Sequence, residues 1–181
     1  MELVDIYNNK HEKLNYQKER KTLEDGEYRL SCFVWIINDK DEILIQQRVS
    51  TAKKCANMWE TTSGGAIAGD DALKGALREL EEELGFKADK KDLSFIGSYS
   101  RINDFVEVFL LKSNVDIEEL KLQKDEVQDV KWMTIKDFEK LIDNGKASDT
   151  GYFIFKEYYE KFYNTYVTFE NGKPVFKKKE L

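Results

Sequence analysis

The chain has 181 residues, of which 41% are hydrophobic and 35% are charged, and its net charge is −6. This length and composition are typical of one globular domain with a hydrophobic core. The acidic balance argues against a broad surface for a nucleic-acid backbone, and the two cysteines, Cys32 and Cys55, indicate neither a disulfide framework nor a zinc site.

The start of the chain predicts a cytoplasmic protein with no membrane partner. Residues 1–7 lack the basic and apolar regions of a signal peptide, and no apolar run approaches the length of a membrane span. We expect residues 1–27 to form a polar arm with one short strand at Leu3 to Tyr7. His11, the only histidine in the sequence, lies in a stretch rich in Lys and Glu, which favours an exposed polar residue. Neither a Ser-His-Asp triad nor a histidine metal cluster is therefore available.

Two paired strands are predicted next. Tyr28 to Ile37 is rich in β-branched and aromatic residues and becomes apolar on both alternations, which is typical of a strand covered on both faces. Residues 38–41 form a turn to its hairpin partner, Glu42 to Arg48. Arg48 is either a contact to a substrate phosphate or one member of a surface ion pair. Trp59 is either a base-stacking residue or a partly buried core aromatic.

The helix expected over residues 72–84 follows a glycine-rich segment. Asp70 or Asp71 can cap its start, and Gly85 suits the left-handed conformation that ends a helix. Its apolar residues recur at helical spacing and should be buried on one face. These residues are Leu73, Ala76, Leu77, Leu80 and Leu84.

A second face of this helix carries three carboxylates. Glu79, Glu82 and Glu83 stand at i, i+3 and i+4, so they share a face one turn tall, and Arg78 is the only nearby cation. A run of this kind is usually a solvated acidic surface. Because hard divalent cations take oxygen ligands, the alternative is a magnesium site.

The second half of the chain predicts three more strands and two helices. The strands are 93–99, 104–111 and 127–133, and the first helix is 135–144. Residues 152–163 carry aromatic side chains at helical spacing, which indicates packing. Residues 166–181 contain the turn signal Glu-Asn-Gly-Lys-Pro and form either a small hairpin or a disordered tail.

The stretch Gly64 to Phe86 resembles the signature of the Nudix hydrolase family. That signature reads Gly, five residues, Glu, seven residues, Arg-Glu, an aliphatic, any residue, Glu-Glu, any residue, Gly, and an aliphatic or aromatic. Asp70 stands where the family usually has glutamate, which keeps the charge and shortens the side chain by one methylene. The positions that match in register are Gly64, Arg78, Glu79, Leu80, Glu82, Glu83, Gly85 and Phe86.

The resemblance implies a fold and an activity. It implies an α/β/α sandwich with a mixed β-sheet, over residues 28–165, and a pyrophosphohydrolase. The implied reaction is water attack at phosphorus, which cleaves a diphosphate linkage in a nucleoside diphosphate-X or a related organic pyrophosphate. The implied cofactor is Mg²⁺, with Mn²⁺ as an alternative. The implied partner is a small phosphorylated molecule. The sequence leaves the oligomeric state open, with a homodimer as one alternative.

The family roles can be carried over residue by residue. The carboxylates of Glu79, Glu82 and Glu83 would bind the metal, together with the Gly64 carbonyl, and Glu79 is also a candidate for the base. Arg78 would hold one of these glutamates by a forked hydrogen bond, and Asp70 would assist from the helix start. A later loop often supplies a fourth acid in this family. The remaining candidates are Glu126 for that acid, as an alternative to an exposed loop residue, and Arg48, Trp59 and Arg101 for the substrate.

Two other functions remain open from the sequence. An isopentenyl diphosphate isomerase-like enzyme would need a cysteine and a histidine where this chain has Ser63 and Gly65, and a glutamate where it has Lys124. A non-catalytic nucleotide-binding module of the same fold could lose the carboxylates that this chain keeps. The sequence does not select one diphosphate substrate.

Overall fold

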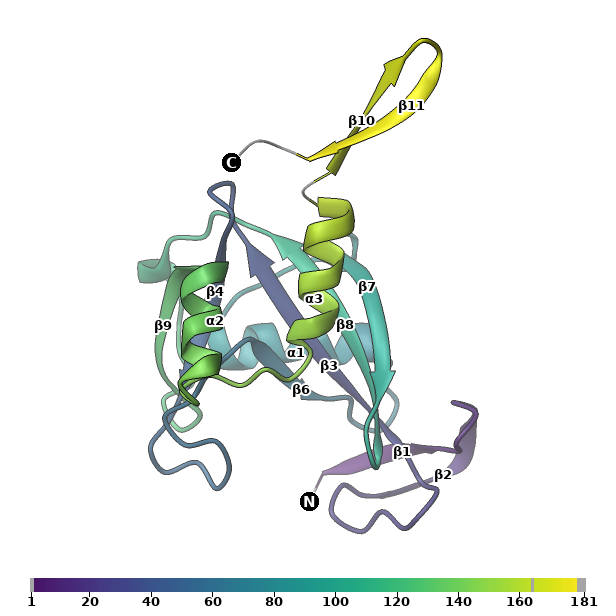
Figure 1. Cartoon of the computed structure of the whole chain (residues 1–181). Helices are drawn as coiled ribbons and strands as arrows, with labels where there is room; N and C mark the ends of the chain where they lie inside the picture. Colours follow the sequence, from purple (N-terminus) through teal and green to yellow (C-terminus); the bar gives the residue numbers. More distant parts are fainter. Residues whose placement is uncertain (1, 164, 179–181) are drawn as a thin grey trace.

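A computed structural model describes residues 2–163 and 165–178 and has a mixed β-sheet between helices (Figure 1). Helix α1 (Ala72–Leu84) covers one face of the sheet, and α2 (Ile135–Asp143) and α3 (Tyr152–Tyr158) cover the other. The expected α/β/α sandwich is therefore confirmed. Within the described residues the main sheet contains β3 (Arg29–Ile37), β4 (Glu42–Arg48), β5 (Trp59–Glu60), β6 (Thr62–Gly65), β7 (Leu93–Ser100), β8 (Asp104–Lys112) and β9 (Val127–Thr134).

Strand β3 is the centre of this sheet. It pairs in parallel with β8 along its whole length, from Arg29 opposite Asp104 to Ile37 opposite Lys112. It also pairs antiparallel with β4 at residues 36–37 and with β6 at residues 31–34. Strands β5 and β9 pair antiparallel with β4, and β7 pairs antiparallel with β8. The sheet is mixed because only the β3–β8 pair runs parallel among the described strands.

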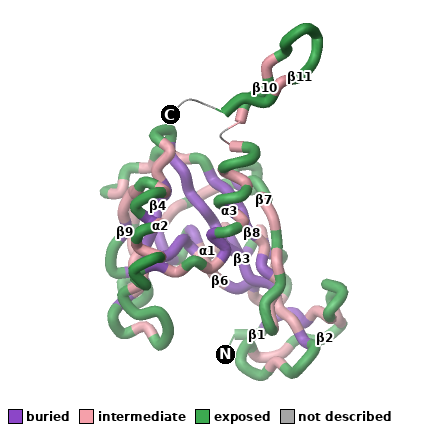
Figure 2. Tube along the Cα trace, in the orientation of Figure 1, coloured by how far each residue is buried: buried purple, intermediate pink, exposed green. Residues whose placement is uncertain are grey.

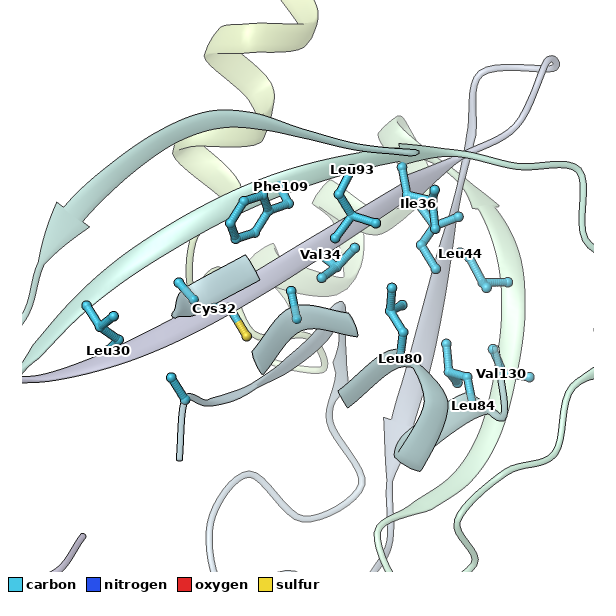
Figure 3. Packing of buried hydrophobic residues seen from close by; sticks show 14 residues of the cluster. Leu30, Cys32, Val34, Ile36, Leu44, Leu80, Leu84, Leu93, Phe109 and Val130 are labelled. Carbon is cyan, nitrogen blue, oxygen red and sulfur yellow. The ribbon is translucent and has the colours of Figure 1, made fainter. Parts of the chain in front are cut away.

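The alternation along β3 divides the core into two layers, because successive strand side chains face opposite sides of a sheet. One set packs against Leu80 and Leu84 of α1 (Figure 3), and the other packs against α2 and α3. The expectation that this strand is covered on both faces is confirmed. The side chains toward α1 are Leu30, Cys32, Val34 and Ile36, and those toward α2 and α3 are Phe33, Trp35 and Ile37.

Helix α1 begins and ends as the sequence predicts. The Asp71 carboxylate caps it by accepting a hydrogen bond of 2.7 Å from the backbone N–H of Lys74. Gly85 ends it with φ of 65°, and a Cβ there would lie 2.8 Å from the Cβ of Lys121. Ala76, Leu80 and Leu84 are buried, while Leu73 and Leu77 are partly buried against the same cluster.

The N-terminal arm contains two strands, β1 (Leu3–Tyr7) and β2 (Lys13–Glu19), which pair antiparallel. The prediction of one strand missed β2, whose side chains are mostly exposed and show no apolar alternation. Val4 and Ile6 of β1 are fully buried, and the N–H of Ala68 donates to the Leu3 carbonyl at 2.8 Å. The arm is therefore anchored beside the segment that leads into α1.

Glu27 fastens β2 to the loop before β3. Its carboxylate accepts hydrogen bonds from Tyr16 at 2.8 Å, from Lys18 at 2.9 Å and from the N–H of Glu24 at 2.8 Å. The Lys18 hydrogen bond is the largest cause that lowers the pKa of Glu27 from its ordinary value of 4.5 to about 2. The stabilisation is therefore complete above pH 4.5 and is lost as the pH falls toward 2.

Replacing Glu27 by glutamine is expected to lower the free energy of unfolding at pH 7 by about 1–2 kcal/mol, because hydrogen bonds to a charged group are lost. The gap between variant and wild type should shrink as the pH falls below 4.5, since the carboxylate of the unfolded wild type then takes up a proton while that of the folded protein stays charged. Urea unfolding at pH 7 and pH 3.5 measures this, with the exposed Asp25→Asn as control. A gap that stays constant over this pH range would contradict the assignment.

The end of the chain forms a small hairpin of β10 (Thr165–Glu170) and β11 (Lys173–Lys178). It follows a short π-helix, Tyr159–Tyr163, that continues α3. The hairpin projects away from the sandwich and is mostly exposed (Figures 1 and 2). Of the two expectations for residues 166–181, the described part is the hairpin, and residues 179–181 lie outside the described residues. Two 3₁₀ turns, Lys90–Asp92 and Ile117–Glu119, complete the secondary structure described. Every helix in the described part of the chain is too short or too polar to cross a bilayer.

Candidate active site

A cavity of about 630 Å³ opens beside β6 and the acidic face of α1. The expected acidic residues reach it from two parts of the chain that are distant in sequence, namely α1 and the loop before β9. Of the candidate site residues named from the sequence, the structure brings together Arg48, Gly64, Arg78, Glu79, Glu82, Glu83, Arg101 and Glu126 in the wall of this cavity.

The three α1 carboxylates lie at different depths. The Glu83 side chain is almost fully buried, and one of its oxygens accepts a hydrogen bond of 2.9 Å from Gln46 Nε2. Glu79 is mostly buried against Gly64, where a Cβ would overlap its carboxylate. Glu82 is half exposed at the cavity mouth. Gly64 is therefore required by the space that Glu79 occupies, and its own φ is not in the left-handed region.

Arg78 positions two of these carboxylates. Its Nη1 donates to Glu82 Oε2 at 2.6 Å, and its Nη2 lies 3.1 Å from Glu79 Oε1 and donates to the Gly65 carbonyl at 2.6 Å. Its Nε is buried and has no hydrogen-bond partner within the described part of the chain. The Asp70 carboxylate lies 3.9 Å from this nitrogen. Asp70 is thus close to this donor without a hydrogen bond to it.

Negative charge accumulates along the cavity wall. Burial raises the pKa of Glu79 to about 7, and the charges of Glu82 and Glu126 act in the same direction against the attraction of Arg78. Burial also raises the pKa of Glu83 well above its ordinary value, with contributions from Glu79 and Glu60. These are carboxylates that gain stability from a neighbouring cation.

The donor set fits a hard divalent cation, although its oxygens are dispersed. Among the described residues, no group of three or more His, Cys, Asp or Glu side chains forms a ready-made metal site. Glu82 accepts a hydrogen bond from Arg78, and Glu83 accepts one from Gln46. The chemistry of the group is nevertheless the one that Mg²⁺ prefers, because several carboxylate oxygens line one solvent-open cavity.

The other candidate residues have different surroundings. Arg48 forms an ion pair of 2.8 Å with Glu60 in the cavity wall, so it is both cavity-lining and paired. Arg101 lies before β8, 2.9 Å from Asp104, and its Cζ is 5.8 Å from the centre of the Phe33 ring. Glu126 is exposed at the rim, 3.4 Å from Gln123 Nε2.

The base-stacking role considered for Trp59 is corrected by its position. Its side chain is buried in the core layer under α2, and it is not part of the cavity wall. Lys131 Nζ lies 3.8 Å from the centre of its ring, which gives this face of the indole a cationic partner. The alternative reading, a core aromatic, agrees with the structure because β5 turns this side chain inward beside β4.

Sequence reasoning missed three residues of the cavity region. Arg20 and Arg29 line the cavity, and Gln46 holds Glu83. Gln46 could have been found, since it is a polar residue in the strand Glu42–Arg48 that is otherwise apolar in its centre. No local sequence pattern points to the two arginines as site residues. Arg20 directly follows strand β2, which the sequence did not predict, and Arg29 is the first residue of β3.

Comparisons of the sequence identify a family and its relatives. Residues 27–153 match the NUDIX domain model. The uncharacterized Nudix hydrolase lin0387 of Listeria innocua is 31% identical over 153 residues, which are 81% of this chain and 89% of the relative. The uncharacterized Nudix hydrolase lmo0368 of Listeria monocytogenes is 32% identical over 125 residues, which are 68% of this chain and 74% of the relative.

Solved structures share the fold at low sequence identity. DR0079 from Deinococcus radiodurans has a TM-score of 0.70 at 18% identity, covering 86% of this chain and 98% of its own. The NUDIX domain of Shewanella oneidensis NrtR complexed with ADP ribose has a TM-score of 0.58 at 16% identity, covering 81% of this chain and 94% of its own. A third structure is a bifunctional NMN adenylyltransferase/ADP ribose pyrophosphatase from Francisella tularensis, complexed with AMP and a Mn ion. It has a TM-score of 0.58 at 20% identity, covering 74% of this chain and 42% of its own.

Proposed function

This chain belongs to the Nudix family of hydrolases and is a pyrophosphohydrolase, and from this premise we propose that it is a metal-dependent enzyme. In this proposal it cleaves a diphosphate linkage in a nucleoside diphosphate-X, or a related organic pyrophosphate, by water attack at phosphorus. One observation carries the proposal. The three α1 carboxylates, Arg78 and Glu126 line the same cavity.

The proposed residue roles are those of the family signature, and the shared cavity wall supports them. Glu82 and Glu83, with Glu79 and the Gly64 carbonyl, would hold Mg²⁺, or Mn²⁺ as an alternative. When bound, such an ion neutralises charge on phosphate oxygens and lowers the pKa of a bound water. Arg78 fixes the positions of Glu79 and Glu82, and Glu79 is also a candidate to accept the proton of the attacking water.

Two of the structural neighbours support the ligand class. One is complexed with ADP ribose, and another with AMP and a Mn ion. These ligands contain nucleoside phosphates, which favours a small phosphorylated molecule as the partner of this chain. We also propose a cytoplasmic location and a homodimer. Light scattering after size-exclusion chromatography measures whether the protein is a dimer.

A phosphate-release screen tests the activity directly. Nucleotides and diphosphate compounds are incubated with the protein and Mg²⁺, and Glu82→Gln serves as the blank. Cleavage of a nucleoside diphosphate-X leaves two phosphomonoesters and no inorganic phosphate, so the products are resolved by chromatography, or an added phosphatase converts them to phosphate before detection. We expect these products from at least one nucleoside diphosphate-X, and their formation should require the divalent cation and be suppressed by EDTA. Failure with every compound in both Mg²⁺ and Mn²⁺, by folded protein, would reject the proposal. Isopentenyl diphosphate belongs in the panel, with product analysis to detect isomerisation.

Replacing Glu126 by glutamine is expected to lower kcat by about 10- to 100-fold, as loss of a group that tunes a metal site typically does. The thermal midpoint should change little, because the side chain is exposed at the rim. The neighbouring Asp125→Asn is the matched control, since Asp125 is exposed and does not line the cavity. Full activity of Glu126→Gln would remove Glu126 from the site.

A further inference from the structure

The arginines of this chain are all in one place. The sequence contains five, and every one of them lines the cavity beside β6. Of the many lysines that the structure describes, Lys54 alone lines this cavity. A general need for positive charge would be met by both residue types, whereas arginine is favoured where a planar fork must hold the oxygens of a phosphate. The five are Arg20, Arg29, Arg48, Arg78 and Arg101.

Two of these arginines already have carboxylate partners in the proposed catalytic region, since Arg48 pairs with Glu60 and Arg78 pairs with Glu82. The other three form a separate group, the arginine cluster. It consists of Arg20 directly after β2, Arg29 at the start of β3 and Arg101 before β8. The guanidinium carbons of Arg20 and Arg29 both lie within 4 Å of the position that a Cβ on Gly65 would take. Arg29 Nε and Arg101 Nη2 lie 2.7 and 2.9 Å from the same carboxylate, that of Asp104.

The arginine cluster carries more positive charge than its partners neutralise. Asp104 is shared by two of the guanidinium groups, and Glu2 lies 3.5 Å from Arg20. Arg29 Nη1 is buried and has no hydrogen-bond partner within the described residues. Burial lowers the pKa of Arg29, and the charges of Arg20 and Arg101 act in the same direction. An anion is the partner that would relieve this repulsion.

The arginine cluster and the α1 carboxylates lie on opposite sides of one strand. Gly64 faces Glu79, and Gly65 faces Arg29 and Arg20. Adjacent residues of a strand point to opposite faces, so the two groups meet across β6, and both line the same cavity. An anion at the arginine cluster is therefore a different group from the diphosphate that the carboxylates and a metal would hold.

We propose that the arginine cluster is a subsite for a further phosphate group of the substrate. The inference rests on the proposed function and names its substrate class, an organic pyrophosphate that carries a phosphomonoester besides the linkage that is cleaved. Three guanidinium groups around one site match a dianionic phosphate with three free oxygens, each of which accepts hydrogen bonds from a fork. The arm supplies Arg20, so it is part of the site.

Binding of inorganic phosphate to metal-free protein is the first test. Calorimetry in EDTA should detect binding of inorganic phosphate to the wild type and to Glu82→Gln with the same affinity, because phosphate binding at the arginine cluster does not require the metal. Arg20→Gln and Arg101→Gln should each weaken it by about 10- to 100-fold, the loss expected for hydrogen bonds between charged groups. Arg101→Lys, which keeps the charge without the fork, should be intermediate. Lys91→Gln, which removes a charge outside the cavity, is the control.

Hydrolysis of matched compounds is the second test. NADPH and NADH differ by one phosphomonoester, and so do coenzyme A and dephospho-coenzyme A. We expect kcat/KM to be at least about tenfold higher for the phosphorylated member of one pair, and this ratio to fall toward one in Arg20→Gln. Thermal unfolding shows whether each variant is folded.

Failure of the phosphate subsite and failure of the proposed hydrolase activity give different experimental results. Phosphate binding that is absent from the wild type, or unchanged in folded Arg20→Gln and Arg101→Gln, overturns the subsite and leaves the proposed hydrolase standing. A ratio near one for both pairs in the wild type overturns the substrate class. Phosphate binding that depends on the arginine cluster, in a protein that cleaves no diphosphate at all, supports the anion site and rejects the hydrolase.

Discussion

Replacing Glu82 by glutamine is expected to lower kcat by about 10³-fold or more, the scale of several kcal/mol of lost charge stabilisation in the transition state. Glu82 stands at the mouth of the cavity with its carboxylate 2.6 Å from Arg78 Nη1. Glutamine keeps the shape and removes the charge. In the proposed site, a metal ligand and the charged partner of Arg78 are then lost together.

The helix provides its own control for this prediction. Glu81 lies next to Glu82 in sequence, is exposed, and forms an ion pair of 3.1 Å with Lys87 outside the cavity. Glu81→Gln removes the same charge and should keep the wild-type kcat. Both variants should unfold at nearly the wild-type temperature, because both side chains are at least half exposed. Equal activity of the two variants would remove Glu82 from the proposed site.

Replacing Phe155 by alanine is expected to lower the free energy of unfolding by about 3–5 kcal/mol, the range for a large aromatic removed from a core. Phe155 of α3 is fully buried and stacks on Trp35 of β3, with ring centres 4.6 Å apart. Removing it leaves a cavity between α3 and the sheet. A chain of this size should lose about 2–4 °C in its thermal midpoint for each kcal/mol.

Phe153 tests whether burial or aromatic content is responsible. It lies in the same helix, is about half exposed at 53%, and touches the Tyr99 ring edge-on. Phe153→Ala should cost about 1 kcal/mol or less, since one exposed aromatic pair is lost. Urea unfolding of both variants gives the comparison. Equal losses would contradict the assignment of Phe155 as the anchor of α3.

The elements found from the sequence are those with a strong local pattern. The strand Arg29–Ile37 carries apolar residues on both alternations, and the helix Ala72–Leu84 has an apolar stripe with a cap at each end. Such segments are specified by their own residues. Strand β2 is polar, and β6 is four residues long with two glycines, so neither has a periodic apolar signal. Their pairing with β1 and with β3 determines them.

The residues of the candidate site also differ in whether the local sequence could identify them. Glu79, Glu82 and Glu83 could be assigned from spacing, because one helix turn brings them together. Arg20 and Arg29 could not, since they meet only after the arm has packed against the start of β3. Trp59 was named for its chemistry, and its burial depends on where β5 pairs with β4.

The two adjacent glycines of β6 restrict how this enzyme can acquire a new specificity. The space beside Gly64 is filled by a carboxylate and that beside Gly65 by a guanidinium group, so any larger residue at either position displaces a charge. Laboratory evolution aimed at another substrate should therefore recover few changes in this strand. Ser148 and Thr150, which border the same cavity from the loop before α3, are the positions where accepted substitutions should accumulate.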